Sequence, residues 1–107
     1  SSFLTAVSND YLFDRIYSRL IDGIGNKGDI LVGISTSGNS KNIINAFKVC
    51  NKIGINTIAL TGESGGKLKG YADILINVPS NDTPRIQESH IMIGHIICEI
   101  VEKNIFT

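Results

Sequence analysis

A hydroxyl-rich turn between an apolar run and a helical pattern constrains the fold of this chain more than any other feature. Residues 33–40 read Gly-Ile-Ser-Thr-Ser-Gly-Asn-Ser and directly follow the apolar run of residues 30–32. After the turn, apolar side chains recur at helical spacing, at Ile43, Ile44, Phe47 and Cys50. This order predicts a strand, a tight turn and a helix.

The hydroxyl groups of the turn favour an anion pocket. Three serines and one threonine lie close to the predicted start of the helix: Ser35, Thr36, Ser37 and Ser40. A helix exposes unpaired backbone N–H groups and the positive end of its dipole at this point, which suits a phosphate. The alternative is a plain helix cap, for which a single serine or asparagine suffices. Because capping does not need so many hydroxyl groups, the phosphate interpretation is favoured.

Two common nucleotide-binding loops do not match this turn. The turn at residues 33–40 has neither the Gly-x-x-x-x-Gly-Lys-Ser/Thr pattern nor the Gly-x-Gly-x-x-Gly pattern. The next apolar run, residues 57–60, is followed by Thr61 rather than by an acidic residue that would bind a ribose. Hydroxyl groups without a lysine suit a small phosphomonoester, bound mainly by dipoles and hydrogen bonds.

Length and composition predict one ordinary globular domain. The chain has 107 residues, 42% of them hydrophobic, and a formal net charge of +0. The absence of a basic excess argues against a nucleic-acid partner, and the apolar runs are too short to cross a membrane. Cys50 and Cys98 both lie in helical patterns, so we expect buried, reduced thiols and a cytoplasmic location rather than a disulfide or a metal pair.

The chain begins with Ser1 and is predicted to be the C-terminal portion of a longer protein. Residues 1–7 resemble the end of a strand that runs into a loop. We therefore expect residues 1–107 to form one domain that lacks its N-terminal part.

Strand and helix patterns alternate along the rest of the chain. A helix starting near Asn9 and Asp10 is predicted to end at the glycines of residues 25–28, and Gly54 suits a left-handed helix cap. The other predicted segments are strands 29–34, 56–60 and 73–78, helices 40–53 and 85–104, a short basic helix around 67–69, and a polar loop at 79–84.

This alternation predicts an α/β fold, with a parallel sheet covered by helices on both faces in a three-layer, Rossmann-like sandwich. Ligands bind such sheets at the carboxyl ends of the strands, where the turns at 35–40 and 61–66 would meet. The last helix is predicted to bury one side, formed by Ile86, Ile93, Ile97, Ile100 and Val101. It is also apolar at Ile91, Met92 and Ile96, which favours packing against N-terminal helices that precede this chain, against a partner subunit, or against both.

The turn of residues 33–40, preceded by Gly-Asp-Ile-Leu-Val, resembles the sugar isomerase (SIS) domain. Leu-Thr-Gly at residues 60–62, Gly-Gly-Lys at 65–67, and Arg-Ile-Gln-Glu-Ser-His-Ile at 85–91 followed by His95 are similar to the phosphoheptose isomerase branch. The resemblance covers essentially the whole chain. The Arg-Ile-Gln-Glu-x-His run is also shared with a bacterial replication-initiator-associating protein.

The resemblance implies the interconversion of sedoheptulose 7-phosphate and D-glycero-D-manno-heptose 7-phosphate, which supplies lipopolysaccharide or capsule precursors. It assigns phosphate binding to Ser35, Thr36, Ser37 and Ser40. It also places the catalytic histidine at His95, a metal-ligating glutamine at Gln87 and a substrate-facing aspartate at Asp10. Zinc as cofactor, a cytoplasmic homotetramer and active sites at subunit boundaries are further implications.

Two departures from the family keep other interpretations open. The family's upstream Gly-Asn-Gly-Gly-Ser turn and its His-x-x-x-Glu segment have no match here, so this chain carries about half of the active site. A non-enzymatic sugar-phosphate sensor or a replication-initiator partner is therefore the alternative function. For His95 the alternative is a core histidine bonded to a backbone carbonyl. We expect His90 to be structural or interfacial, and Lys67 and Lys69 to be surface charges.

Overall fold

A parallel three-stranded sheet forms the centre of the structure, a computed structural model that describes residues 15–106. The strands are β1 (Ile30–Ile34), β2 (Asn56–Thr61) and β3 (Ile74–Asn77), in the spatial order β1-β2-β3. The register pairs Ile30 with Asn56 and Ile58 with Ile74. The predicted parallel α/β sheet is confirmed, with strand ends within one residue of those expected.

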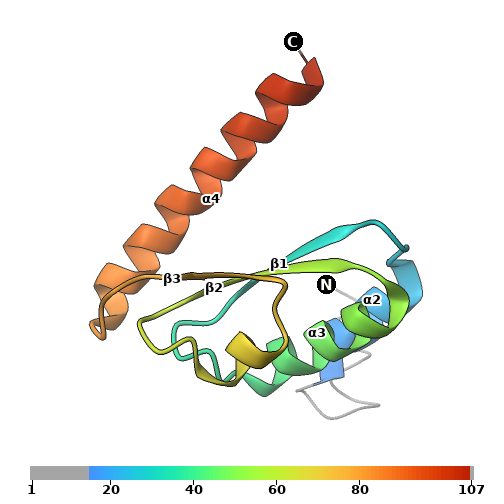
Figure 1. Ribbon diagram of the computed structural model, residues 1–107, viewed down its shortest axis with the longest axis horizontal. Helices are drawn as coiled ribbons and strands as arrows, with labels where there is room; N and C mark the ends of the chain where they lie inside the picture. The colour runs from blue at the N-terminus through green and yellow to red at the C-terminus, as the bar shows by residue number, and fades with distance from the viewer. Residues whose placement is uncertain (1–14, 107) are drawn as a thin grey trace.

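Helices lie on both sides of this sheet. Figure 1 shows α2 (Ile16–Ile24), α3 (Lys41–Ile53) and the short 3₁₀ helix η2 (Gly66–Gly70) on one side, and α4 (Thr83–Phe106) rising from the other. No helix within residues 15–106 has the length and apolar character that crossing a membrane requires. The expectations for residues 1–7 and for a helix start at Asn9 and Asp10 lie outside the described residues.

Local sequence signals account for most of the helix ends. α3 ends at Gly54, which adopts the predicted left-handed conformation with φ of 93°. α4 begins at Thr83, so the prediction of a loop through Pro84 is wrong. Proline fits the first turn of a helix because its missing N–H would have no intrahelical partner there and its fixed φ is already helical.

The main core lies between the sheet and the α2–α3 side. Phe47, Ala59 and Leu68 are fully buried together, and Gly33 gives the Phe47 ring its space because a Cβ there would overlap the ring. A neighbouring cluster joins α2 to α3 through Ile21, Ala46, Cys50 and Ile55. Apolar burial on this side fixes both helices against the strands.

The two cysteines differ in burial. Cys50 is fully buried, as predicted, and burial raises the pKa of its thiol. Cys98 is exposed, so its predicted burial is wrong. It lies on the part of α4 that extends beyond the sheet, where an apolar neighbourhood in the sequence does not produce burial.

The second face of the sheet is only partly covered. We expected both faces of β1 to be buried, but Ile30 is 65% exposed and Ile34 is 54% exposed. α4 contacts β2 and then runs away from the strands (Figure 1). Within α4 the buried side chains are Ile86 and His90.

The predicted buried side of α4 therefore needs correction. Ile93 and Ile97 are half-buried, whereas Ile100 and Val101 are about half exposed. The apolar stripe continues past the point where the sheet ends. Further apolar side chains of α4 are exposed as well: Ile91, Met92, Ile96, Ile105 and Phe106.

Candidate phosphate-binding site

A polar cavity of about 320 Å³ lies where β1 and β2 end. Thr36 and Ser37 contribute from the turn after β1, and Gly62 and Glu63 from the turn after β2. The other lining residues are Asn39, Ser64, Ser80, Asn81, Thr83 and Ile86. The two turns expected at the carboxyl edge of the sheet do meet there.

The four predicted phosphate-binding hydroxyl groups divide into two pairs. Thr36 and Ser37 line the cavity, whereas Ser35 is 5% exposed and lies beneath the turn. The Ser35 and Ser40 hydroxyl oxygens are 2.8 Å apart and share a hydrogen bond. The Gly38 N–H also donates to the Ser35 hydroxyl oxygen, at 3.1 Å. Ser35 and Ser40 therefore hold the turn that presents Thr36 and Ser37.

The plain-cap interpretation of these hydroxyl groups does not match the geometry. Ser40 is the N-cap residue of α3, yet its hydroxyl bonds Ser35 rather than a backbone N–H of the helix. The Ile43 N–H is satisfied instead by the side chain of Asn42, at 2.9 Å. The N–H groups of α3 that precede Ile43 and the cavity-lining hydroxyl groups are thus available to an anion at this end of the helix.

The turn after β2 docks directly onto the serine turn. The Gly62 N–H donates to the Thr36 carbonyl at 2.9 Å, and the Leu68 N–H donates to the Gly38 carbonyl at 2.9 Å. The Asn39 side chain accepts from the Lys67 N–H at 2.9 Å. These bonds require close backbone approach at Gly38, whose φ is +71° and whose Cβ would overlap the Gly65 carbonyl.

The electrostatics of the cavity come mainly from dipoles. Among the described residues that line it, Glu63 alone carries a charge, and that charge is negative. A phosphate here would rely on hydroxyl groups and backbone N–H groups, as the sequence suggested. The exposed Glu63 carboxylate disfavours a ligand that carries another anionic group besides its phosphate, close to Glu63.

A third wall of the cavity was missed from the sequence. Ser80 and Asn81 line it from the connection between β3 and α4, and Thr83 lines it from the first residue of α4. The Glu63 N–H donates to the Ser80 carbonyl at 3.2 Å, which ties this connection to the turn after β2. The signal was present, because a polar loop that follows a parallel strand lies at the same edge as the other two turns.

α4 carries the residues predicted for chemistry. Gln87 and His95 are both exposed and lie outside the lining of the cavity, although Ile86 beside Gln87 belongs to it. The core histidine considered as an alternative for His95 is found at His90 instead. His90 is 2% exposed, and its Nε2 lies 2.9 Å from the Thr61 carbonyl oxygen. The expectation that His90 is structural is confirmed.

The predicted metal site is not complete within the described residues. Within residues 15–106, no three His, Cys, Asp or Glu side chains gather in a metal-binding arrangement. Catalytic zinc sites take about three protein ligands, and the sequence offers Gln87 and His95 on one helix. These two alone do not make a zinc site. Asp10 lies outside the described residues.

Comparisons with known proteins agree on one family. The SIS domain family model matches residues 2–62. A phosphoheptose isomerase of Sulfurimonas denitrificans is 60% identical over 106 residues, which cover 99% of this chain and 54% of that protein. The chain spans about half the length of the curated relatives it matches.

Solved structures give the same result. A phosphoheptose isomerase from Neisseria gonorrhoeae superposes with a TM-score of 0.92 at 46% identity, covering 96% of this chain and 58% of that one. A phosphoheptose isomerase from Francisella tularensis gives 0.91 at 40% identity, covering 95% and 55%. The fold described above is therefore shared with the matched part of both proteins.

Proposed function

The chain belongs to the SIS domain family, and we propose that the protein is a phosphoheptose isomerase that interconverts sedoheptulose 7-phosphate and D-glycero-D-manno-heptose 7-phosphate. The hydroxyl-lined cavity at the strand ends is the observation that carries the proposal, because it suits a phosphate without a lysine. The relatives that match nearly the whole of this chain are named phosphoheptose isomerases, which supports a heptose phosphate as the substrate.

In this proposal Thr36 and Ser37 bind the substrate phosphate directly. Ser35 and Ser40 contribute by holding the turn, since their hydroxyl groups bond each other. Asp10 and Gln87 contact the sugar part of the substrate, following the family pattern.

We assign the acid–base step to His95. Aldose–ketose isomerisation removes a proton from the carbon beside the carbonyl and returns one to the neighbouring carbon. A histidine suits this task because its ordinary pKa lies near neutrality. His95 is exposed, so a substrate can reach its ring. A second acid–base group is needed to handle the oxygen atoms, and we expect it outside residues 15–106.

We propose zinc as a cofactor, with Gln87 and His95 as two of its ligands. They lie eight residues apart on α4, about 12 Å along the helix axis, so their side chains must lean toward each other. The remaining ligands must come from residues elsewhere in the protein. Metal analysis of the purified protein tests this, and Gln87→Ala is expected to lower the bound zinc.

We further propose a cytoplasmic homotetramer that acts in the synthesis of lipopolysaccharide or capsule precursors. The exposed apolar side chains of β1 and α4 support self-association, because monomers rarely leave such surfaces uncovered.

The decisive experiment incubates the full-length protein with sedoheptulose 7-phosphate and follows aldose formation. Turnover is expected, with His95→Asn slowing it about a hundredfold or more while leaving sugar-phosphate binding in place. Tight binding without any turnover would support the alternative, a non-enzymatic sugar-phosphate sensor or a replication-initiator partner. The observation that favours that alternative is that no three metal-ligating His, Cys, Asp or Glu side chains gather within residues 15–106.

A further inference from the structure

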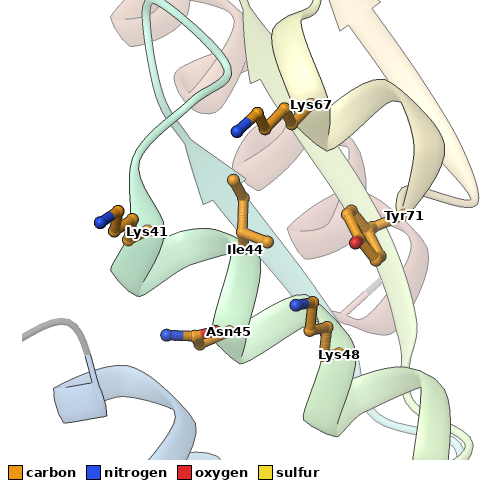
Figure 2. Close-up of a pocket in the computed structure, with 6 residues that line it drawn as sticks. All are labelled: Lys41, Ile44, Asn45, Lys48, Lys67 and Tyr71. Atoms are coloured by element: carbon orange, nitrogen blue, oxygen red, sulfur yellow. The ribbon is translucent and has the colours of Figure 1, made fainter.

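A second and larger cavity lies between α3 and η2. The proposed function gives this cavity no role. It encloses about 520 Å³ and is lined by Lys41, Ile44, Asn45, Lys48, Lys67 and Tyr71. Figure 2 shows these side chains around the opening, and we call this cavity the lysine cleft. It shares no lining residue with the candidate phosphate site.

One face of α3 builds most of the lysine cleft. Its four residues from α3 follow the spacing i, i+3, i+4 and i+7, which places them on one side of a helix. Ile44 is buried and forms an apolar part of the lining, while Tyr71 is half-buried on the opposite side. The lysines therefore border a concave surface rather than standing alone on a convex one.

Positive charge is concentrated in this cleft. The whole chain has a formal net charge of +0, yet three lysines and no Asp or Glu among residues 15–106 line the cavity. The ion pairs recorded in this part of the chain join other residues. Uncompensated charge of one sign in a concave site attracts oppositely charged ligands.

The spread of the lysines indicates what kind of anion fits. Lys41 and Lys48 are two helical turns apart, about 10 Å along the axis of α3. Lys67 extends toward the Lys41 end of the cleft (Figure 2), and the Lys48 ammonium lies 5.5 Å from the centre of the Tyr71 ring. A single phosphate is too small to reach both ends, whereas a chain of linked phosphates spans them.

We propose that the lysine cleft binds a small molecule with a linear diphosphate or triphosphate chain, either free or carried by a nucleoside. Lys41 and Lys67 hold one end of the chain and Lys48 the other. The contact between Lys48 and the Tyr71 ring orients the ammonium, because the face of an aromatic ring attracts a cation.

Isothermal titration calorimetry on the full-length protein tests this proposal with inorganic triphosphate, ATP and inorganic phosphate as separate ligands. The variant Lys41→Gln/Lys48→Gln removes two charges from the cleft. The matched control Lys52→Gln/Lys69→Gln removes two charges from the same helices outside its lining. The unsubstituted protein is expected to bind triphosphate more tightly than phosphate. The affinity for triphosphate should be roughly tenfold weaker in the cleft variant and nearly unchanged in the control.

Several outcomes would overturn the proposal. They are no triphosphate binding, triphosphate binding no tighter than phosphate, and equal weakening in both double variants, which would indicate unspecific surface charge. Loss of triphosphate binding in Ser37→Ala would place the ligand in the candidate phosphate site instead. Equal affinities for ATP and triphosphate identify the phosphate chain as the whole ligand, whereas tighter ATP binding identifies a nucleotide.

Discussion

Two serines of one turn have different roles at the scale of single residues. Ser37 lines the cavity, and its oxygen accepts the Asn39 N–H at 3.0 Å, so its proton remains available to a phosphate. We expect Ser37→Ala to weaken sugar-phosphate binding by about 1.5–3 kcal/mol and to leave the unfolding free energy nearly unchanged. Calorimetry with sedoheptulose 7-phosphate measures this, with Ser18→Ala on α2 as a control. Unchanged affinity would show that the hydroxyl group serves the turn alone.

Ser35 is expected to behave in the opposite way. Its buried hydroxyl serves Ser40 and the Gly38 N–H. Ser35→Ala removes both bonds, so the unfolding free energy should fall by about 1–3 kcal/mol. Denaturant unfolding of Ser35→Ala beside Ser37→Ala distinguishes a residue that supports the turn from one that binds the phosphate. Equal stability of Ser35→Ala and the unsubstituted protein would contradict the supporting role assigned here.

The two thiols should differ in reactivity. Cys98 is exposed, whereas Cys50 is fully buried. A thiol reagent is expected to label Cys98 quickly and Cys50 only as the protein opens, because the thiolate is the reactive form and burial also raises the Cys50 pKa. Cys98→Ser should remove the fast phase. A fast phase that survives this substitution would contradict the assignment.

The raised pKa of Cys50 also predicts a pH dependence of stability. The unfolded chain releases this proton at lower pH than the folded chain does. The contribution of Cys50 to stability is therefore complete below the pKa of the unfolded thiol and is lost as pH rises above it. Unfolding measured from neutral to alkaline pH should show a steeper loss in the unsubstituted protein than in Cys50→Val. Parallel curves would show that burial of this thiol has no such effect.

At the scale of elements, the serine turn and the turn after β2 depend on each other. Gly38 has positive φ, and an added Cβ would overlap the Gly65 carbonyl. Gly38→Ala is expected to cost about 1–3 kcal/mol of unfolding free energy and to weaken phosphate binding as the two turns separate. Gly23→Ala in α2 is the matched control, because its Cβ meets nothing within 4 Å. A Gly38→Ala variant as stable as this control would contradict the predicted docking.

The strands and most helix ends could be predicted from local patterns, since apolar runs and glycine caps act over a few residues. Exposure along α4 could not be predicted, because it depends on where the sheet ends. His90 lies in the same stripe as Ile86, Ile93 and Ile97, which are four, three and seven positions away from it. That spacing identifies it as a core residue, whereas the bond to Thr61 requires the tertiary structure.

The candidate site shows the same division between local and tertiary information. Thr36 and Ser37 could be predicted because the turn follows a strand directly. The pairing of Ser35 with Ser40 and the wall formed by Ser80 depend on how three turns meet. The lysine cleft likewise needs η2 to pack against α3, which no local pattern specifies.

At the scale of the whole molecule, the uncovered apolar side chains predict assembly. Ile96 and Ile100 on α4 are 46% and 53% exposed. We expect light scattering to find the full-length protein as an oligomer, and Ile96→Glu/Ile100→Glu to shift it to a lower mass, because burying a charge in an apolar interface is costly. Glu102→Lys, a charge change on the same helix, should leave the mass unchanged. An oligomer that survives the double substitution would show that this part of α4 is not at the interface.

The strand order also bears on how the chain folds. Each strand pairs with the next strand in the sequence, joined to it by a crossover through α3 or through η2, so no strand in the described part of the chain waits for a partner from a distant segment. α4 meets the sheet through His90 at Thr61 and through Ile86 beside Gly62, so it needs β2 in place first. We expect the anion-binding turn to form early in folding. The helix that carries Gln87 and His95 would then dock last, onto a phosphate site that is already built.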